Sequence, residues 1–278
     1  MEYILLAILA VIIIIIAAMA AIVKPKKLTE EQKKRITKRF YAHRGLYKQD
    51  QSVPENSMTA FRLAARHGYG IELDVRLTKD GKAVVFHDEG LRRACGVEKT
   101  RVRKLTYEEL SQYRLFGTEE RIPLLEQVLK EIDGRVPLLI DIRASGPEQT
   151  DKTCEAVLEQ LRAYGGSYAV QSAEPRALVW FRRNAPDVLR GQLTEGYREK
   201  SKKLSDAQRF ARRHLLYNAR TRPHFISCNI GEYGAFGVRL CMALFHPVSV
   251  GWTVREEIDS AKLRSDFNIL VFEFYMPD

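Results

Sequence analysis

The chain has 278 residues, and 45 Lys and Arg against 35 Asp and Glu give it a formal net charge of +10. No nucleic-acid-binding signature accompanies this charge, so we expect no nucleic-acid partner and favour an anionic membrane surface or substrate. None of the four cysteines lies at CxxC spacing, which argues against a thiolate zinc site and weakly favours a reducing compartment.

The first predicted element is a transmembrane helix over residues 1–23. Tyr3 to Val23 is a run of 21 residues without charge, which rises about 31 Å as a helix and matches a hydrocarbon core of about 30 Å. A cleaved signal peptide is the alternative, since Ala18, Ala20 and Ala21 resemble a cleavage site. The long apolar run and the absence of Lys or Arg before it argue against cleavage. A buried globular helix is less favoured still, because the segment is apolar on every face.

A basic linker is predicted next, over residues 24–39. Its basic residues are Lys24, Lys26, Lys27, Lys33, Lys34, Arg35, Lys38 and Arg39. Because positive charge marks the cytoplasmic flank of a span, we expect a single-pass membrane protein whose C-terminal domain is cytoplasmic. The cluster is then expected against anionic headgroups, the alternative being an ordinary solvated linker.

Short apolar runs alternate with helical stretches from residue 40 onward. The predicted strands are Phe40–His43, Tyr69–Leu77, Ala83–His87, Leu138–Ile142, Tyr168–Gln171, Val188–Gln192, Phe225–Cys228, Val248–Trp252 and Ile269–Glu273. The predicted helices between them include Ser57–His67, Leu124–Ile132, Thr150–Ala163, Pro175–Asn184, Asp206–His214 and Arg255–Arg264. This alternation predicts an α/β fold with a parallel sheet, and the length suits one TIM (β/α)8 barrel over residues 40–278.

One of the nine strands is the return arm of a hairpin. Asp80-Gly81 is a two-residue turn signal between two β-type runs, so Tyr69–Leu77 and Ala83–His87 are predicted to pair. Removing the return arm leaves eight barrel strands. Residues 89–122 then form a small insertion after the hairpin.

The same hairpin brings functional side chains together. A two-residue loop sets Lys79 opposite Lys82, and counting back along both arms sets Asp74 opposite His87. Glu72 and Asp74 are two residues apart and share a face of their strand. Two carboxylates and an imidazole are therefore expected at the C-terminal ends of strands, where barrel enzymes have their active sites.

Two further strand ends add matching chemistry. The first strand ends in His43-Arg44, and a later one contains Asp141 and Arg143. Three clustered carboxylates repel one another unless a cation lies between them, and oxygen ligands suit Mg²⁺ or Ca²⁺. Arginines suit a phosphate, and two histidines suit acid–base cleavage of a P–O bond. A single histidine or strand aspartate is more often structural, so the hypothesis depends on all seven groups converging.

These residues carry a family resemblance. The stretch His43–Leu91 contains HRG, PEN followed by an AF helix, ELDV, TKDG and VVFHD in that order. It resembles the glycerophosphodiester phosphodiesterase family, which shows the same five motifs. Looser similarity in RIPLLEQVLKEI, Gln171-Ser172 and Val250–Val254 extends the resemblance over about residues 40–278. It implies metal-dependent hydrolysis of glycerophosphodiesters to an alcohol and glycerol 3-phosphate.

The resemblance also implies a role for each site residue. His43 and His87 match the acid–base pair, and one divalent cation, Mg²⁺ or Ca²⁺, matches three carboxylate ligands, which are Glu72, Asp74 and Asp141. Arg44 and Arg143 match the groups that contact the substrate phosphate. Trp252 is expected to line the substrate pocket or, equally, to belong to the barrel core. Glu55 is expected near the site, and Asn56 is expected to cap the helix that begins at Ser57.

The sequence departs from the family pattern at four places. The family usually has Glu at Asp141 and Lys at Arg143, which changes the reach of one metal ligand and one phosphate contact. The SF pair reads Ser172-Ala173, and TDYP reads Glu273-Phe274-Tyr275-Met276-Pro277. The last two changes concern pocket shape and therefore the substrate more than the reaction.

Two other functions stay open at this point. A phospholipase D-like lyase would act on lysophospholipids and form a cyclic phosphate, and a membrane anchor would hold such substrates close. A non-catalytic, membrane-tethered phosphate-binding module is the second alternative, although it has no need for two histidines and three carboxylates. The sequence leaves the headgroup, the choice of Mg²⁺ or Ca²⁺ and the oligomeric state open.

Overall fold

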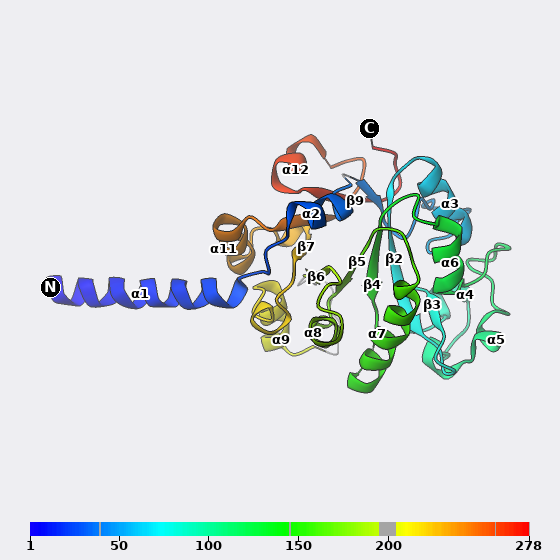
Figure 1. The fold of residues 1–278 in the computed structure, drawn as a ribbon, viewed down its shortest axis with the longest axis horizontal. Helices are drawn as coiled ribbons and strands as arrows, with labels where there is room; N and C mark the ends of the chain where they lie inside the picture. The colour runs from blue at the N-terminus through cyan, green and yellow to red at the C-terminus, as the bar shows by residue number, and fades with distance from the viewer. Residues whose placement is uncertain (39, 145, 195–203, 259, 278) are drawn as a thin grey trace.

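The computed structural model describes residues 1–278 except 39, 145, 195–203, 259 and 278 (Figure 1). The helices are α1 (Glu2–Val23), α2 (Glu30–Ile36), α3 (Met58–Arg66), α4 (Arg92–Cys95), α5 (Tyr107–Leu110), α6 (Leu125–Ile132), α7 (Pro147–Arg162), α8 (Pro175–Asn184), α9 (Asp206–Arg213), α10 (Asn218–Thr221), α11 (Phe236–Phe245) and α12 (Ser260–Asp266), with 3₁₀ turns η1 (Val102–Lys104) and η2 (Ile230–Glu232). The strands are β1 (Phe40–Ala42), β2 (Gly70–Leu77), β3 (Ala83–Val85), β4 (Leu138–Ile142), β5 (Tyr168–Ser172), β6 (Arg190–Leu193), β7 (Phe225–Asn229), β8 (Val248–Val254) and β9 (Ile269–Phe272).

Eight parallel strands close into a barrel. The sheet runs β1-β9-β8-β7-β6-β5-β4-β2-β3, and a pairing of β1 with β2 closes it. Only β3 is antiparallel among these strands, and it lies outside the barrel as the return arm of the hairpin with β2. The TIM-type fold is confirmed. Both ends of each predicted strand lie within two residues of the ends of the observed strand.

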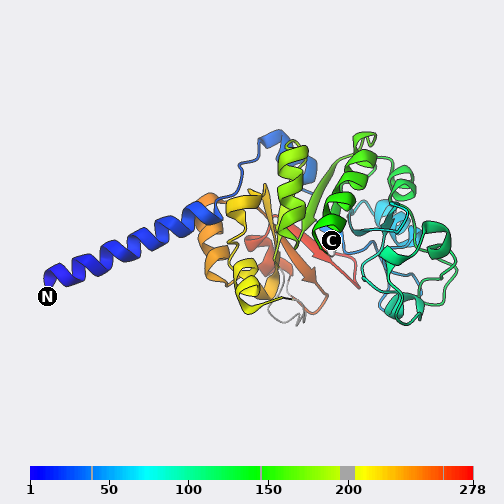
Figure 2. The same cartoon turned by 90° about the horizontal axis from the view of Figure 1, so that it is seen from below.

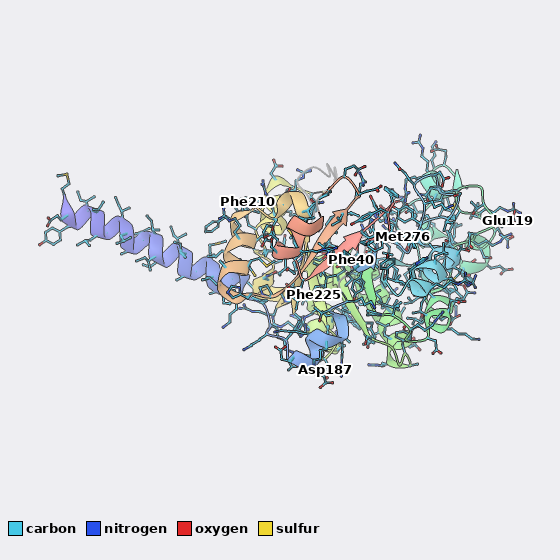
Figure 3. The ribbon with its side chains drawn as sticks, turned by 90° about the horizontal axis from the view of Figure 1, so that it is seen from above. Phe40, Glu119, Asp187, Phe210, Phe225 and Met276 are labelled. Carbon is cyan, nitrogen blue, oxygen red and sulfur yellow. The ribbon has the colours of Figure 1, made fainter. Side chains whose placement is uncertain are left out.

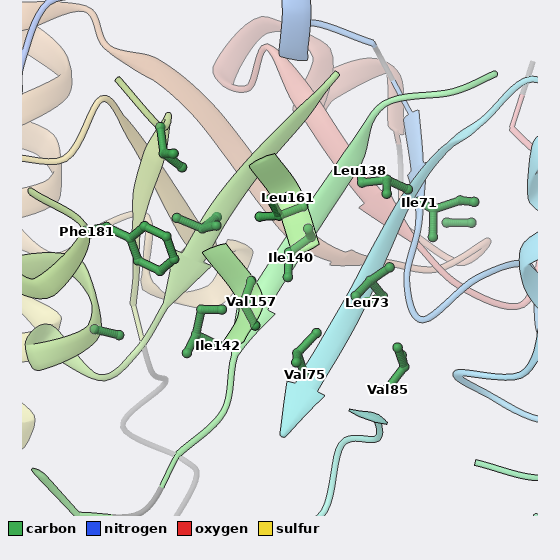
Figure 4. Close-up of a cluster of buried hydrophobic side chains, with 14 of the residues drawn as sticks. Ile71, Leu73, Val75, Val85, Leu138, Ile140, Ile142, Val157, Leu161 and Phe181 are labelled. Atoms are coloured by element: carbon green, nitrogen blue, oxygen red, sulfur yellow. The ribbon is translucent and has the colours of Figure 1, made fainter. Parts of the chain in front are cut away.

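The main hydrophobic cluster lies between the barrel wall and its helices. Figure 4 shows Leu73 and Val75 of β2 beside Ile140 of β4, with Val157 and Leu161 of α7 packed across them. These strands carry apolar residues on both faces because the helices cover the outside and the barrel encloses the inside. This packing fixes the positions of the strand ends that carry the site.

Residues 24–39, predicted as a linker, contain a helix that packs on the barrel. Thr29 begins α2 with a capping box, accepting from the backbone N–H of Gln32. Leu28 and Ile36 are buried in a second cluster, formed with residues of the barrel strands. The hydroxyl of Tyr41 on β1 donates to the carbonyl of Ile36 at 2.7 Å. The segment therefore covers the N-terminal end of the barrel, opposite the ends that carry the site (Figure 1).

The hairpin register differs by one residue from the predicted one. Val75 pairs with Val85, and the N–H of Phe86 donates to the carbonyl of Asp74 at 2.9 Å. Asp74 thus lies opposite Phe86, and the predicted pairing of Asp74 with His87 is wrong.

The loop of the hairpin explains this shift. Thr78 donates its N–H to the carbonyl of Lys82, so three residues, not two, separate the arms. Gly81 takes φ +78° at the last loop position, as a three-residue loop requires. His87 lies beyond the end of β3, where its carbonyl accepts from Nε of Arg76 at 2.8 Å. Leaving the strand lets its side chain reach the site despite the shifted register.

Residues 89–122 form a compact insertion beside the hairpin. They include α4, η1 and α5, and they carry a small hydrophobic cluster of their own with Val84 and Phe86. Its buried members from the insertion are Leu91, Ala94, Val102, Leu110, Leu115 and Ile122. The cluster ties the insertion to the return arm that ends next to His87.

The helix α1 projects away from the barrel as a single straight element (Figures 1 and 2). Of the described residues, it alone forms a helix long and apolar enough to cross a membrane, and 6% of its most apolar stretch is buried. Its exposed apolar surface is large for a protein in water, because monomeric proteins seldom expose a contiguous patch of this kind.

We expect Ile36→Ala to lower the free energy of unfolding by about 2–5 kcal/mol, because it opens a cavity in the cluster at the base of the barrel. The measurement is denaturant unfolding of the full chain in detergent. Lys34→Ala, an exposed change on the same helix, is the control and should change stability by less than about 0.5 kcal/mol. Equal, small effects of the two changes would show that α2 adds nothing to the domain.

Candidate active site

The predicted site residues meet in one cavity of about 290 Å³ at the C-terminal ends of the strands. Seven of the eight line it: His43, Arg44, Glu72, His87, Asp141, Arg143 and Trp252. The eighth, Asp74, contacts Arg143 at 2.8 Å and Arg44 at 3.4 Å. The barrel thus collects side chains from β2, β4 and β8 and from the segments that follow β1, β3 and β4.

Three buried carboxylates form the acidic part of the site. Glu72 and Asp74 come from β2 and Asp141 from β4, and the parallel register sets Asp74 directly beside Asp141. They are 3%, 1% and 2% exposed, and one oxygen from each lies within 4.8 Å of the others. Buried carboxylates this close together repel one another, and nearby positive charge reduces that repulsion.

The protein balances these charges unevenly. Burial, with the negative charges of Asp74 and Asp141, holds the pKa of Glu72 well above its ordinary value. Burial also raises the pKa of Asp141 to about 6, although Arg143 opposes the shift. Burial would raise the pKa of Asp74 too, but the charges of Arg143, His87 and Arg44 outweigh it and hold that pKa well below the usual range.

The residues present fit a bound divalent cation. Oδ1 of Asp141 is buried, and no described residue donates a hydrogen bond to it. The three side chains offer only oxygen ligands, as Mg²⁺ and Ca²⁺ prefer. Within the described structure their charge is partly balanced by Arg143, whose Nε lies 2.8 Å from Asp74 and 2.9 Å from Asp141.

His43 is held by a carboxylate that sequence reasoning gave no role. Its Nδ1 lies 2.8 Å from Oε2 of Glu273, which leaves Nε2 for the cavity. Glu273 also accepts from the hydroxyl of Tyr47 at 2.8 Å and from Nε of Arg255 at 2.7 Å. Burial raises the pKa of Glu273, but these hydrogen bonds and the charge of His43 outweigh it and bring the pKa to about 2. Burial and the charge of Arg44 lower the pKa of His43.

His87 is held in the same way by its neighbour in sequence. Its Nδ1 lies 2.6 Å from Oδ1 of Asp88, and Oδ2 of Asp88 accepts from Nε of Arg93 at 2.7 Å. Burial lowers the pKa of His87 to about 4. Arg93 also donates to Glu55, and Glu55 accepts from Arg44 at 2.8 Å. This network connects the His87 side of the site to the first barrel strand.

The conformation around Arg44 depends on the glycine that follows it. Arg44 itself has φ +54°, and its backbone N–H donates to Glu72 at 3.1 Å. Gly45 has φ +80°, and a Cβ there would lie 2.9 Å from the backbone of Ala60 on α3. The HRG motif therefore combines the Arg44 guanidinium, which lines the cavity, with the one residue type that lets the chain turn close to α3.

Two other expectations concern Trp252 and Asn56. Trp252 lines the cavity and also packs against the cluster inside the barrel, so both of its expected locations hold. Its indole N–H is buried without a partner among the described residues. Asn56 is not the helix cap, because Ser57 accepts from the N–H of Ala60 in that role. The amide of Asn56 donates instead to Asp74 at 2.9 Å.

Sequence reasoning missed the groups that orient the histidines. Asp88 was visible as the last residue of VVFHD, and an acidic residue directly after a candidate histidine was the available signal. Glu273 lies 230 residues from His43 along the chain, and its only signal was an acid at the end of the last strand. Tyr47 and Arg255 left no signal, because their roles depend on Glu273.

Comparisons with known proteins agree with this geometry. The sequence model of the glycerophosphoryl diester phosphodiesterase family matches residues 43–265. A glycerophosphodiester phosphodiesterase of Bacillus altitudinis is 43% identical over 112 residues, 37% of this chain and 44% of the relative. A lysophospholipase D of Rattus norvegicus is 33% identical over 150 residues, 49% of this chain and 46% of the relative. The matched part thus spans less than half the length of these two curated relatives.

Solved structures share the fold at low sequence identity. A phosphodiesterase of Oleispira antarctica in complex with sn-glycerol-3-phosphate has a TM-score of 0.68 and 22% identity, and the match covers 86% of this chain and 93% of that one. A glycerophosphodiester phosphodiesterase of Thermotoga maritima has a TM-score of 0.63 and 24% identity, over 84% and 93% of the two chains. The family match covers most of the barrel and all eight predicted site residues, while Glu273 lies beyond it. The chain belongs to the glycerophosphoryl diester phosphodiesterase family.

Proposed function

We propose that this chain hydrolyses glycerophosphodiesters to an alcohol and glycerol 3-phosphate in a metal-dependent reaction. One observation carries the proposal: two histidines, each held at Nδ1 by a carboxylate, line one cavity with two arginines, beside a cluster of three buried acids. Such a set suits a phosphodiester, which needs charge neutralisation on its oxygens and proton transfer at two others. The names of the relatives support the same reaction.

Glu72, Asp74 and Asp141 are the residues that would hold the cation, either Mg²⁺ or Ca²⁺. When bound, a divalent ion supplies positive charge that polarises a phosphate oxygen and favours a deprotonated hydroxyl. Arg44 and Arg143 bind the phosphate oxygens and stabilise the charge that develops on them. Arg143 already spans Asp74 and Asp141, so the same guanidinium links the acids to the phosphate.

His43 and His87 move the protons. Their lowered pKa values keep both imidazoles neutral at neutral pH, so either one is ready to take a proton from the attacking hydroxyl. The other imidazole then delivers a proton to the departing alcohol. Glu273 and Asp88 keep the ring proton on Nδ1, so that Nε2 faces the reacting oxygens. The nucleophile is water or the substrate's own glycerol 2-hydroxyl, which would pass through a cyclic phosphate.

Trp252 is proposed as a wall of the substrate pocket. Its unpartnered indole N–H gives that wall a hydrogen-bond donor besides its apolar face. A glycerol or headgroup oxygen is the kind of acceptor that such a donor fits.

A second candidate is cleavage of lysophospholipids with release of a cyclic phosphate. It is favoured by the exposed apolar helix α1, which would keep the enzyme where such lipids are found. One relative carries the name lysophospholipase D. A non-catalytic phosphate-binding module is the remaining alternative, and the pair of oriented histidines argues against it.

The proposed organisation is a transmembrane helix over residues 1–23, a basic segment over 24–39 and the catalytic barrel over 40–278. The basic residues after α1 support a cytoplasmic location for the barrel in a single-pass membrane protein. Close packing of the end of α1 on the barrel supports a helix that is retained, because cleavage near Ala20 would remove part of that contact.

The test of the reaction uses the full chain in nanodiscs. Glycerophosphocholine, glycerophosphoethanolamine and lysophosphatidylcholine are each incubated with Mg²⁺, Ca²⁺ or EDTA, and the products are followed by phosphorus NMR. Glycerol 3-phosphate formed from the soluble diesters, and lost with EDTA, is the expected result. A cyclic phosphate formed only from the lysolipid would favour the second candidate, and no product from any substrate would contradict both.

We expect His43→Ala and His87→Ala each to lower kcat by at least about 100-fold, because each removes one proton-transfer group. Turnover of glycerophosphocholine by the purified full chain is the measurement. His67→Ala removes an exposed histidine outside the cavity and serves as the control. Near-normal turnover in either site variant would remove that histidine from the mechanism.

Glu273→Gln should lower kcat by about 10-fold to 100-fold while KM stays nearly unchanged, because the imidazole of His43 remains but loses the group that orients it. Arg255→Gln is a matched change on the same network that leaves the bond between His43 and Glu273 in place, so its effect should be smaller. An equal effect of both variants on kcat and on thermal stability would indicate a structural role for Glu273.

Asp141→Asn should weaken the binding of Mg²⁺ or Ca²⁺ by at least about 10-fold, because cation affinity depends on the number of charged ligands. Titration calorimetry measures this binding independently of turnover. Asp187→Asn, an exposed change at a residue that does not line the cavity, should bind the cation like the unmodified chain. Unchanged affinity in Asp141→Asn would contradict the proposed metal site.

A further inference from the structure

We propose that the barrel is docked on the bilayer by a second contact, an apolar patch of α9 and α11 next to the base of α1. The patch consists of Phe210, Phe236, Leu240 and Leu244 and is called the docking patch below. Its occupant is an anionic bilayer surface. The proposal rests on the membrane insertion of α1 proposed above, and it does not depend on the reaction.

The end of α1 is fixed to the barrel and does not continue into a free tether. Val23 is fully buried, and its carbonyl accepts from the amide of Asn218 on α10 at 2.9 Å. Arg222 donates to the carbonyls of Ala21 and Lys24, both at 3.0 Å, and so provides positive charge at the C-terminal end of the helix. These contacts determine how the barrel is oriented when α1 is in a membrane.

The length of α1 brings the barrel surface to the bilayer. The uncharged run Tyr3–Val23 is about as long as the hydrocarbon core is thick. Its last five residues, about 7 Å of helix, are the part that packs on the barrel, since Met19 and Ile22 contact the main hydrophobic cluster. If the whole run spans the core, the neighbouring surface of α10 and α11 must lie at the level of the headgroups.

Exposed apolar side chains occupy the surface next to the C-terminal end of α1. Phe210, Phe236 and Leu244 are 55%, 52% and 51% exposed. Phe236, Leu240 and Leu244 follow one another at intervals of four residues, which sets them on one face of α11. Cys241, next to Leu240 on that helix, donates to the carbonyl of Val23. The apolar face therefore lies directly beside the helix that enters the membrane.

Phe210 belongs to the same patch through a chain of contacts. Its ring lies 4.3 Å from the ring of His214. Nδ1 of His214 accepts from the N–H of Gly237 at 3.3 Å, and Phe236 is the preceding residue on α11. Figure 3 shows Phe210 on the side of the barrel from which α1 emerges. Figure 2 shows α11 beside the C-terminal end of α1.

The charges around the patch fit an anionic surface. Lys24 and Lys26 follow α1 directly and are exposed, and Arg239 is exposed on α11. Aromatic and leucine side chains that enter the headgroup region, with basic side chains beside them, form the usual pattern of interfacial membrane binding. Each basic residue near an anionic surface adds about 1 kcal/mol. A water-soluble protein partner would not explain why the patch adjoins the membrane helix.

The test measures how close each position comes to lipid in nanodiscs that contain the full chain. Cys95→Ala removes the half-buried cysteine, and the other three cysteines are buried. A single cysteine is then introduced and dye-labelled at position 210, 236 or 244, with position 119 as the control at the far end of the molecule (Figure 3). The discs contain phosphatidylglycerol and a lipid with a spin label near its headgroup.

We expect dyes at positions 210, 236 and 244 to lose about half of their fluorescence or more, because groups docked in this way lie within about 5–10 Å of the acyl boundary. The dye at position 119 should lose little. Leu244→Glu should reduce the quenching of the dye at 210, whereas Met276→Glu, a matched change at another exposed apolar residue, should not. Equal quenching at all four positions, or none at 210, 236 and 244, would overturn the proposal.

Turnover of glycerophosphocholine by the same samples separates the two proposals. An active chain whose patch dyes are unquenched refutes the docking and leaves the reaction intact. An inactive chain whose patch dyes are quenched supports the docking and counts against the proposed reaction.

Discussion

The structure of the site depends on one constraint, which is the close approach of three buried carboxylates. The parallel register of β2 and β4 sets Asp74 beside Asp141, and Glu72 lies two residues earlier on the same face. Burying charge in this way costs several kcal/mol for each ion unless positive groups compensate it. Arg44 and Arg143 contact Asp74 and supply part of this compensation, and the three oxygen ligands fit a divalent cation.

Each of the two histidines is also held in place by a charged neighbour. His43 follows β1 and His87 follows β3, and each is oriented by a carboxylate that is itself held by an arginine. The two halves are therefore built alike, although one partner is the next residue and the other comes from the end of the last strand. Such support keeps ring orientation fixed without help from a substrate.

Much of the fold was predictable because its signals are local. The spacing of apolar residues and the turn residues between them predicted the nine strands. Because active sites of TIM barrels lie at the C-terminal ends of the strands, His43, Glu72 and Asp141 were then expected at one end of the barrel. The hairpin register was not predictable, because a two-residue and a three-residue loop around Gly81 have the same turn signal. The role of Glu273 and the packing of residues 24–39 were missed because both depend on contacts between distant parts of the chain.

The proposed membrane insertion of α1, together with the hydrogen bonds that hold its C-terminal end to the barrel, has a consequence for how substrates approach. In Figure 1 the helix extends sideways, across the direction of β2 and β4. With α1 upright in a bilayer, the barrel lies on its side, and its open end faces along the membrane plane. A water-soluble diester then enters parallel to the surface, and a lipid would reach the cavity by lateral diffusion instead of being lifted out perpendicular to the membrane. If α1 spans a membrane as proposed, the same few hydrogen bonds at the end of this helix determine both the anchoring of the barrel and the access to its cavity.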